Sequence, residues 1–349
     1  MPNEKKQLRV LVVRLGAMGD ILHALPAVTA LRQAHPEWFL GWAVEPQWSG
    51  LLCADGATVR GPRMPLVDRI HIVPAKQWSR APLSLPTLRD LQRVRRELRE
   101  AEYDLCIDLQ GAVRSALLGR WSRAPRLIGE AQPREPMARW FFGERVATQG
   151  VHVIEQAIEV VEQAAGDVLP SVLPWLPVDE VAEAAAARYA RPFVLINPGA
   201  GWGAKRWPIE RYAEVVHSLC SDGYAVLANA GPKELLLVQE LVRLTGGVVQ
   251  PVTPDLTELI AITRRTALTI AGDTGPLHLA CALGRPVVGI FGPTDPARNG
   301  PFGCDFRVLR HPESRRDHSR RSEPEAGLLT ITPEAVIEAA RELLEKRRD

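Results

Sequence analysis

The segment that decides the fold is ALTIAGDTGPLHLA, residues 267–280. Its first residues are apolar and predict a strand, and residues 277–283 predict a helix that begins just past the turn around Asp273 and Gly275. The N-terminus of a helix binds phosphate, because its unpaired backbone N–H groups and the helix dipole both favour negative charge. His278 lies one helical turn later, within reach of the same anion. A plain turn in which Asp273 caps the helix fits this segment as well.

The same alternation of apolar runs and amphipathic stretches extends along the chain. It predicts strands at residues 8–15, 40–44, 69–73, 105–109 and 127–129, and helices at 21–34, 88–102 and 154–165. Three prolines within residues 169–177 then mark a linker, because proline continues neither a helix nor a central strand. The pattern restarts with strands at 193–197, 225–229, 248–251, 268–271 and 287–291, and with helices at 209–221, 233–244, 256–264 and 277–283.

These halves predict an α/β protein with two Rossmann-like, doubly wound parallel-sheet domains facing across a cleft. We place the N-terminal domain at residues 1–172, the C-terminal domain at 173–330 and a final helix, opened by Pro333, within 331–349. Residues 311–327 are polar and predict a mobile surface loop. In such sheets ligands bind at the carboxyl ends of the strands, where the motifs described here all fall.

The composition is that of a soluble globular protein, with 46% hydrophobic and 24% charged residues in a chain of 349. No apolar stretch reaches the roughly 18 residues of a transmembrane helix. The polar first residues and the short apolar run behind them argue against a signal peptide. Five dispersed cysteines without a CxxC pair indicate reduced thiols, and the eight histidines lack the spacing of metal ligands. We therefore expect a cytoplasmic protein without metal or cofactor.

Positive charge concentrates in one region of the first half. Residues 60–145 carry 17 Lys and Arg against 10 Asp and Glu. A solvated helix face explains part of this surplus, and a surface for an anionic partner explains more. The basic residues are not interleaved with aromatic residues expected to be exposed, and no recognised nucleic-acid-binding motif is present, so we expect no nucleic acid. A phosphorylated glycolipid at a membrane surface suits the pattern better.

A second glycine-containing turn is VVRLGAMGDILHALP, residues 12–26. Its spacing is not G-x-G-x-x-G, which disfavours a dinucleotide site. Asp20 stands where a carboxylate caps a helix N-terminus, and the small residues around Gly19 also let a second molecule approach the backbone. A capping role and a catalytic role therefore both remain open for Asp20.

Three further segments complete the pattern: NPGA at 197–200, KRWP at 205–208 and GPKE at 231–234. Together with the turns at 19–20 and 273–278, they resemble glycosyltransferase family 9, which contains the ADP-heptose:lipopolysaccharide heptosyltransferases. The resemblance runs from about Arg9 to Pro296, and the motifs follow one another in the same order as in the family. It implies a GT-B type fold and an inverting, metal-independent glycosyltransferase. The implied reaction moves heptose from ADP-heptose to the Kdo/inner-core region of lipopolysaccharide, as in heptosyltransferase I.

The resemblance also implies roles for individual residues. Asp20 would be the general base that deprotonates the acceptor hydroxyl, and Lys205 would stabilise the charge on the leaving ADP. The implied donor site comprises Gly199, Ala200, Gly201, Lys205, Glu234, Asp273, Thr274, Gly275 and His278. The implied acceptor site comprises Gly19, Asp20, Lys76, Arg80, Gln110, Arg114 and Arg134. This chain departs from the family at 199–201, where hydroxyl side chains are frequent.

The implied partners are the ADP-heptose donor and an anionic, Kdo–lipid A-like glycolipid acceptor, with peripheral contact at the inner face of the inner membrane. Taken one at a time, the basic acceptor residues also fit surface ion pairs, and Glu234 also fits a plain helix N-terminus. A nucleotide-sugar epimerase or hydrolase on the same architecture is the alternative enzyme. Heptosyltransferase II-like transfer onto a heptosylated core, and a non-catalytic nucleotide-sugar binding protein, are the others.

Overall fold

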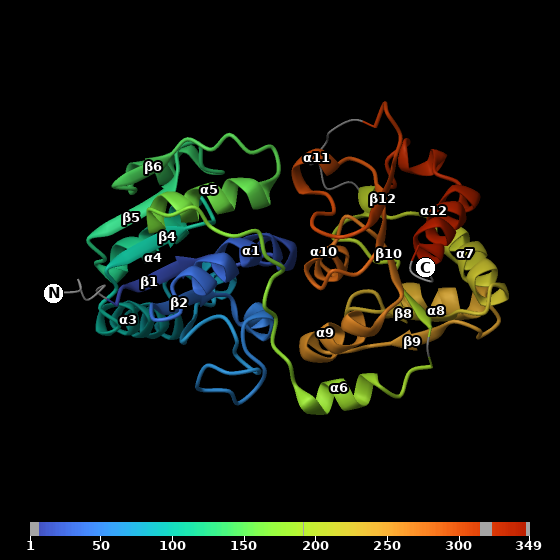
Figure 1. Cartoon of the computed structure of the whole chain (residues 1–349), viewed down its shortest axis with the longest axis horizontal. Helices are drawn as coiled ribbons and strands as arrows, with labels where there is room; N and C mark the ends of the chain where they lie inside the picture. The colour runs from blue at the N-terminus through green and yellow to red at the C-terminus, as the bar shows by residue number, and fades with distance from the viewer. Residues whose placement is uncertain (1–6, 191, 315–322, 347–349) are drawn as a thin grey trace. The chain divides into compact units, whose positions relative to one another are not determined.

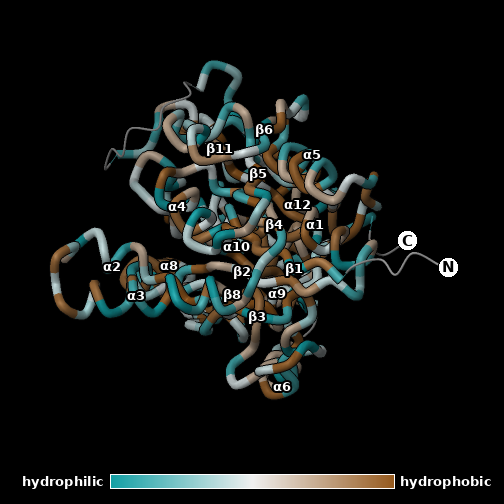
Figure 2. Tube along the Cα trace, turned by 90° about the vertical axis from the view of Figure 1, so that its left-hand side faces the viewer, coloured by the Kyte–Doolittle hydropathy of each residue, from teal (hydrophilic) through white to brown (hydrophobic). Residues whose placement is uncertain are grey.

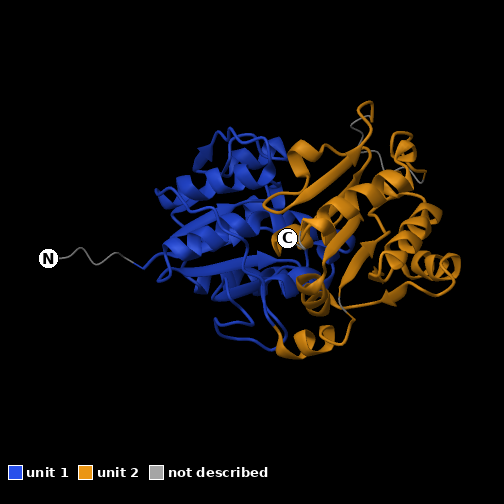
Figure 3. Ribbon diagram, turned by 45° about the vertical axis from the view of Figure 1, so that its right-hand side comes forward, with its two compact units in different colours: residues 1–178 blue, residues 179–349 orange. Residues whose placement is uncertain are grey.

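Two parallel sheets of six strands each organise the chain (Figure 1). The computed structural model describes residues 7–190, 192–314 and 323–346. It divides the chain into two units, Met1–Val178 and Asp179–Asp349 (Figure 3). The division falls later than the expected boundary at 172/173. Backbone bonds explain this, because Trp175 N–H donates to Thr29 Oγ1 at 3.1 Å and Val178 N–H donates to the Pro62 carbonyl at 2.9 Å.

The first sheet has the strand order β3-β2-β1-β4-β5-β6, and every neighbouring pair is parallel. Its strands are β1 Arg9–Val13, β2 Phe39–Val44, β3 Arg69–Ile72, β4 Leu105–Asp108, β5 Arg126–Glu130 and β6 Glu144–Val146. Helices α3 (Leu85–Glu100) and α4 (Val113–Ser122) pack against one face, and α5 (Val153–Ala165) contacts β4 and β5 and packs along α1 (Met18–Ala34). The short elements are η1 Pro46–Leu51, α2 Ala75–Arg80 and η2 Pro136–Trp140.

The second sheet has the order β12-β11-β10-β7-β8-β9. Its strands are β7 Phe193–Asn197, β8 Ala225–Asn229, β9 Gln250–Val252, β10 Leu268–Gly272, β11 Val287–Phe291 and β12 Phe306–Arg310. Counted in chain order within each unit, both sheets therefore run 3-2-1-4-5-6, which is the Rossmann order. The inner strands β7, β10 and β11 are buried throughout, as expected for a parallel sheet covered on both faces.

Helices cover the second sheet as well. They are α7 Ile209–Ser221, α8 Leu235–Leu244, α9 Leu256–Arg265, α10 Gly275–Ala282 and α12 Pro333–Glu345, with the short elements α6 Glu180–Ala186, η3 Gly203–Lys205, α11 Pro296–Asn299 and η4 Leu328–Thr330. The final helix α12 packs against α7 and shares the apolar core of the second unit, so it is not a separate part. Among the described residues, none of the helices combines the length and apolar character needed to cross a membrane.

The sequence pattern missed the edge strands β6 and β12 and the short helices α2, α6 and α11. Both edge strands carry arginine, and none of their residues is fully buried, so their apolar signal is weak. Of the surface loop expected at 311–327, residues 315–322 lie outside the described part. Next to it Ser314 is buried, and its hydroxyl donates to the Glu325 carboxylate at 3.0 Å.

Candidate active site

Three titratable side chains meet at the carboxyl end of the second sheet. The Lys205 ammonium pairs with one oxygen of the Asp273 carboxylate, and His278 Nε2 lies 3.1 Å from the other. The side chains of Lys205, Asp273 and His278 are only 10%, 9% and 6% exposed. Burial alone would raise the pKa of Asp273, but the hydrogen bond with His278 and the charges of His278 and Lys205 hold that pKa well below its usual range. These predicted donor residues therefore form one buried, charge-compensated cluster.

The turn after β10 opens α10 without a side-chain cap. Thr274 occupies the cap position, but its hydroxyl donates to the Gly272 carbonyl at 3.2 Å and makes no capping bond. The alternative in which Asp273 caps the helix is wrong, because its carboxylate is bound within the Lys205 cluster. The helix starts at Gly275, and its N-terminus keeps the character of an anion-binding end.

Glu234 lies at the cap position of α8, against the loop that follows β7. Its carboxylate accepts a hydrogen bond from Gly231 N–H at 3.0 Å, and a Cβ on Gly199 would come within 1.9 Å of its Oε1. Only glycine fits at position 199 while Glu234 keeps this position. In the same loop Ala200 is buried and Gly201 is exposed. The predicted carboxylate and the predicted glycine loop thus come together.

Two buried asparagines at the ends of β7 and β8 were not predicted as site residues. Asn229 Nδ2 donates to Asn197 Oδ1 at 2.7 Å. Asn197 Nδ2 in turn lies 3.3 Å from the Gly199 carbonyl and 3.5 Å from Thr274 Oγ1. This amide chain joins the glycine loop to the turn before α10. An asparagine that closes an otherwise apolar strand is the signal that could have revealed it.

Trp202 was missed as well, although it precedes a predicted site residue. Its ring lies under the Lys205 ammonium, with Nζ 4.3 Å from the ring centroid. Its indole Nε1 is buried and has no hydrogen-bond partner among the described residues. Lys205 is therefore held between an aromatic face and the Asp273 carboxylate.

In the first unit, Asp20 lies in the opening turn of α1. The helix begins at Met18, so Asp20 is its third residue rather than its cap as expected, and its Oδ2 accepts a hydrogen bond from Ala17 N–H at 2.9 Å. Its Oδ1 lies 3.0 Å from Arg14 Nη2, and the side chain is 37% exposed. Arg14 also donates to the Leu109 carbonyl at the end of β4. Both oxygens of Asp20 are thus held while the carboxyl remains open to solvent.

Asp108 ends β4 and is buried. Its Oδ1 accepts hydrogen bonds from the backbone of Gln110 at 2.8 Å and Gly111 at 2.9 Å, and from the Ser115 hydroxyl at 3.1 Å. Its Oδ2 has no partner among the described residues. Burial outweighs the three hydrogen bonds and raises the pKa of Asp108 to about 6. Asp108 therefore shapes the turn that carries Gln110, a predicted acceptor residue.

Contacts around Leu15 tie two predicted acceptor residues to the end of β1. Gln110 Oε1 accepts a hydrogen bond from Leu15 N–H at 2.8 Å. Glu45 N–H donates to the Leu15 carbonyl at 3.0 Å, and the Glu45 carboxylate lies 3.2 Å from Lys76 Nζ. Glu45 is another residue that the sequence pattern did not reveal. Gln110 and Lys76 therefore join the same edge of the sheet as Asp20.

The remaining acceptor candidates have fewer contacts with the rest of the first unit. Gly111 has φ +64°, and a Cβ there would come within 2.9 Å of Arg134 N, so this turn requires glycine and brings Arg134 beside it. Arg80 ends α2 and Arg114 lies in the first turn of α4. All three arginines are exposed and form no ion pair with a described residue. Gly19 lies within the first turn of α1.

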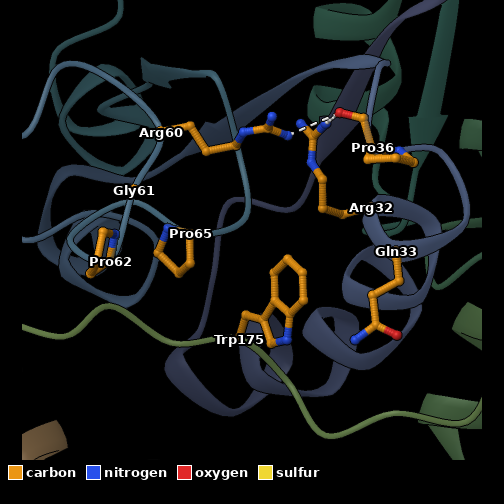
Figure 4. A pocket seen from close by; sticks show the side chains of 8 residues that line it. All are labelled: Arg32, Gln33, Pro36, Arg60, Gly61, Pro62, Pro65 and Trp175. Carbon is orange, nitrogen blue, oxygen red and sulfur yellow. Dashed lines mark hydrogen bonds between the residues drawn. The ribbon is translucent and has the colours of Figure 1, made fainter.

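A cavity of about 520 Å³ lies elsewhere in the first unit, near the start of β2 (Figure 4). Trp175 and Arg32 line it, but the Arg32 guanidinium donates to the carbonyls of Leu66, Pro36 and Trp38 and pairs with Asp68. The guanidinium of Arg32 is thus already bound by other groups of the protein. Within the described ranges, no three or more His, Cys, Asp and Glu side chains are grouped to hold a metal ion.

The model of glycosyltransferase family 9 (heptosyltransferase) matches residues 91–328, more than half of the chain. The chain belongs to glycosyltransferase family 9. It is therefore a glycosyltransferase, and its two Rossmann-ordered units are those of the GT-B fold. Lipopolysaccharide heptosyltransferase 1 of Escherichia coli K12 is 29% identical over 95% of this chain and 98% of its own. The Pseudomonas aeruginosa protein of the same name is 28% identical over 85% and 82%.

Solved structures agree with this assignment. The E. coli heptosyltransferase WaaC with ADP matches with a TM-score of 0.80 and 26% identity, over 96% of this chain and 100% of that chain. The UDP-GlcNAc 2-epimerase of Methanocaldococcus jannaschii matches with a TM-score of 0.54 and 12% identity, over 98% and 94%, and shows the fold alone. The fold is thus shared with another enzyme class, whereas the family membership is specific.

Proposed function

We propose that this family 9 enzyme transfers heptose from ADP-heptose to the Kdo-bearing inner core of lipopolysaccharide, with inversion at the sugar. The observation that carries the proposal is the buried Lys205–Asp273–His278 cluster beside the uncapped N-terminus of α10. A cation, an imidazole and backbone N–H donors together favour the binding of a diphosphate. The relatives named above act as lipopolysaccharide heptosyltransferases by their names.

The donor site of the proposal lies in the second unit. The ADP diphosphate binds at Thr274 and Gly275 with Lys205 and His278 beside it, and the Glu234 carboxylate accepts hydrogen bonds from the ribose hydroxyls. As the bond between the sugar carbon and the diphosphate oxygen breaks, its electron pair leaves with ADP. Lys205 stabilises that growing negative charge. The loop 199–201 contributes backbone N–H groups in place of hydroxyl side chains.

Asp20 is the general base of the proposal. It accepts the proton of the acceptor hydroxyl as that oxygen attacks the sugar carbon on the face opposite the leaving ADP. Arg14, whose Nη2 lies 3.0 Å from Oδ1, keeps the carboxylate oriented for this step. Gly19 lets the acceptor approach the turn, and Gln110 and the basic side chains of Lys76, Arg80, Arg114 and Arg134 bind its anionic groups.

One experiment tests the reaction and its alternatives together. The purified enzyme is incubated with ADP-heptose and either no acceptor, a Kdo-bearing acceptor or a heptosylated core, and both ADP release and product mass are measured. We expect ADP release and a product one heptose heavier with the Kdo-bearing acceptor, also in the presence of EDTA. Consumption of ADP-heptose without acceptor would support an epimerase or hydrolase. Transfer confined to the heptosylated core would support the heptosyltransferase II alternative.

A further inference from the structure

Two amide side chains are buried at the carboxyl ends of neighbouring strands in the second unit. Asn197 ends β7 and Asn229 ends β8, and the two residues are 2% and 5% exposed. In the hydropathy colouring of Figure 2 the inner segments are largely hydrophobic, so such residues are exceptions. Among the described residues of this unit, no other Asn or Gln side chain is buried. Burying an amide costs free energy unless it is hydrogen-bonded, so packing alone does not account for the pair.

The hydrogen bonds of the pair fix the direction in which the Asn197 amide points. Its Oδ1 accepts a hydrogen bond from Asn229 Nδ2 at 2.7 Å, so its own Nδ2 faces the other way. There Nδ2 lies 3.3 Å from the Gly199 carbonyl oxygen and 3.5 Å from Thr274 Oγ1. An amide nitrogen carries two hydrogens, one for each of these acceptors. Asn229 therefore selects the orientation in which Asn197 can donate to both groups.

These two acceptors lie on either side of the point where a doubly wound sheet binds its ligand. In the order 3-2-1-4-5-6 that point is the crevice outside the carboxyl ends of the first and fourth strands, where the strand order reverses. In the second unit these strands are β7 and β10, which pair directly with each other. Gly199 belongs to the loop after β7, and Thr274 belongs to the turn after β10. The Asn197 amide therefore links the two sides of the crevice.

We propose that Asn197 and Asn229 are positioning residues for the diphosphate of the donor. Asn197 holds the Gly199 loop and the Thr274 turn at a fixed spacing, and Asn229 acts through Asn197 by orienting its amide. Neither asparagine needs to touch the ligand, because backbone N–H groups of the loop and of the α10 N-terminus bind it. Donors that are held in place before binding cost less ordering when the ligand arrives. The inference rests on the proposed function, in which ADP-heptose binds at this turn.

Calorimetry of the full chain with ADP and with adenosine tests the pair, because only ADP carries the diphosphate. We expect Asn197→Ala and Asn229→Ala each to lower ADP affinity about fivefold to tenfold, and to change adenosine affinity by less than about twofold. Because Asn229 acts through Asn197, the double variant should bind ADP about as weakly as the weaker single variant. Leucine variants at the two positions, which leave no cavity, replace any alanine variant that melts below the assay temperature.

The matched control is Thr245→Ala, which removes a buried hydroxyl bonded to the Leu241 carbonyl at 2.8 Å, at the C-terminal end of α8. It should lower the melting temperature as the asparagine variants do and leave ADP affinity unchanged. Asparagine variants that bind ADP like the wild type overturn this inference alone. So do additive losses in the double variant, or equal losses for adenosine, because the pair would then not act on the diphosphate through Asn197. Wild-type protein that binds no ADP would remove the proposed donor site together with this inference.

Discussion

Two aspartates occupy matching places in the two units, and their pKa values are shifted in opposite directions. Asp108 ends β4 and Asp273 follows β10, and these strands hold the same position in sheets of the same order. Both carboxyls are buried. The pKa of Asp108 is raised to about 6, because burial outweighs its hydrogen bonds. The pKa of Asp273 lies well below its usual range, because His278 and Lys205 overcome the same burial.

The difference teaches that the partners, not the fold position, decide what a buried carboxyl does. The first unit also has a cation nearby, but Arg14 pairs with Asp20 at the surface and leaves only a weak influence on Asp108. The second unit keeps its cation inside, where a donor diphosphate would compete with Asp273 for Lys205. In the first unit the buried carboxyl of Asp108 therefore binds a proton more readily than an ordinary aspartate. In the second unit the Lys205 ammonium is the group that suits a phosphate.

The largest effect on turnover is expected from a change at Asp20, the partly exposed carboxylate of the first unit. Asp20→Asn preserves shape and the bond from Ala17 N–H but removes the base. Turnover should fall about 10²–10⁴-fold, while ADP-heptose affinity stays close to wild type. Steady-state kinetics and calorimetry measure the two. The control Asp55→Asn changes an exposed aspartate of the same unit and should leave both unchanged. Near-normal turnover in Asp20→Asn would leave Asp20 with only a structural role in α1.

Removing the buried cation should have the next largest effect. Lys205→Met keeps the length of the side chain but leaves the leaving diphosphate without its counter-ion, so turnover should fall about 10²–10³-fold. It also leaves Asp273 short of a partner, which should lower the unfolding free energy by about 3 kcal/mol. The control is Lys346→Met, at an exposed lysine of the same unit.

The sign of the pH dependence sharpens this prediction. A carboxyl whose folded pKa is depressed stabilises the fold above its unfolded pKa of 3.8 and loses that contribution as the pH falls through the folded value. Because Lys205 supplies part of the depression, the difference in unfolding free energy between wild type and Lys205→Met should narrow on acidification. Denaturant titrations over a pH series measure it. A difference independent of pH would mean that Lys205 stabilises the fold without acting on Asp273.

Asp108 should show the opposite behaviour. Its raised pKa means that the folded protein binds the proton more readily, so Asp108 favours folding at low pH and opposes it as the pH rises from 3.8 through about 6. Asp108→Asn stays neutral and should raise the unfolding free energy at neutral pH by about 3 kcal/mol, with little effect in acid. Denaturant titrations compare it with wild type and Asp55→Asn. Destabilisation at every pH would show that the carboxylate form is needed for its three hydrogen bonds.

The inner strands and the turns after them could be predicted from the sequence. Buried parallel strands are apolar throughout, so β7, β8 and β11 were placed with the bounds that the structure has. The turns collect at one edge because parallel strands end there. The family resemblance, rather than the pattern alone, assigned Lys205 and Asp273, far apart in the chain, to one donor site. The fold thus followed from local patterns that repeat.

Pairings between side chains could not be predicted in the same way. Nothing local to Arg14 distinguishes Asp20 from Asp108 as its partner, and Lys76 meets Glu45 only because β2 and β3 lie side by side. The two compact units divide at Val178/Asp179, a few residues after the expected boundary at 172/173, and hydrogen bonds of the linker to the first unit accompany this division. The pKa values could not be predicted either, because those of Asp108 and Asp273 differ through contacts that only the tertiary structure creates.

The smallest effect on turnover is expected from changes to Trp202, whose ring lies beneath Lys205. These variants test whether the aromatic partner of Lys205 contributes to its function. Trp202→Leu removes the ring 4.3 Å from the ammonium and should lower turnover about tenfold, because Lys205 is then held by Asp273 alone. Trp202→Phe keeps a ring but lacks the indole N–H, and should lose only about twofold to threefold. Melting temperatures of the two variants should agree, and donor affinity should change less than turnover in both. If Phe and Leu lower turnover equally, the buried indole N–H rather than the ring face is what the enzyme needs, and Trp202 does not act by positioning the lysine.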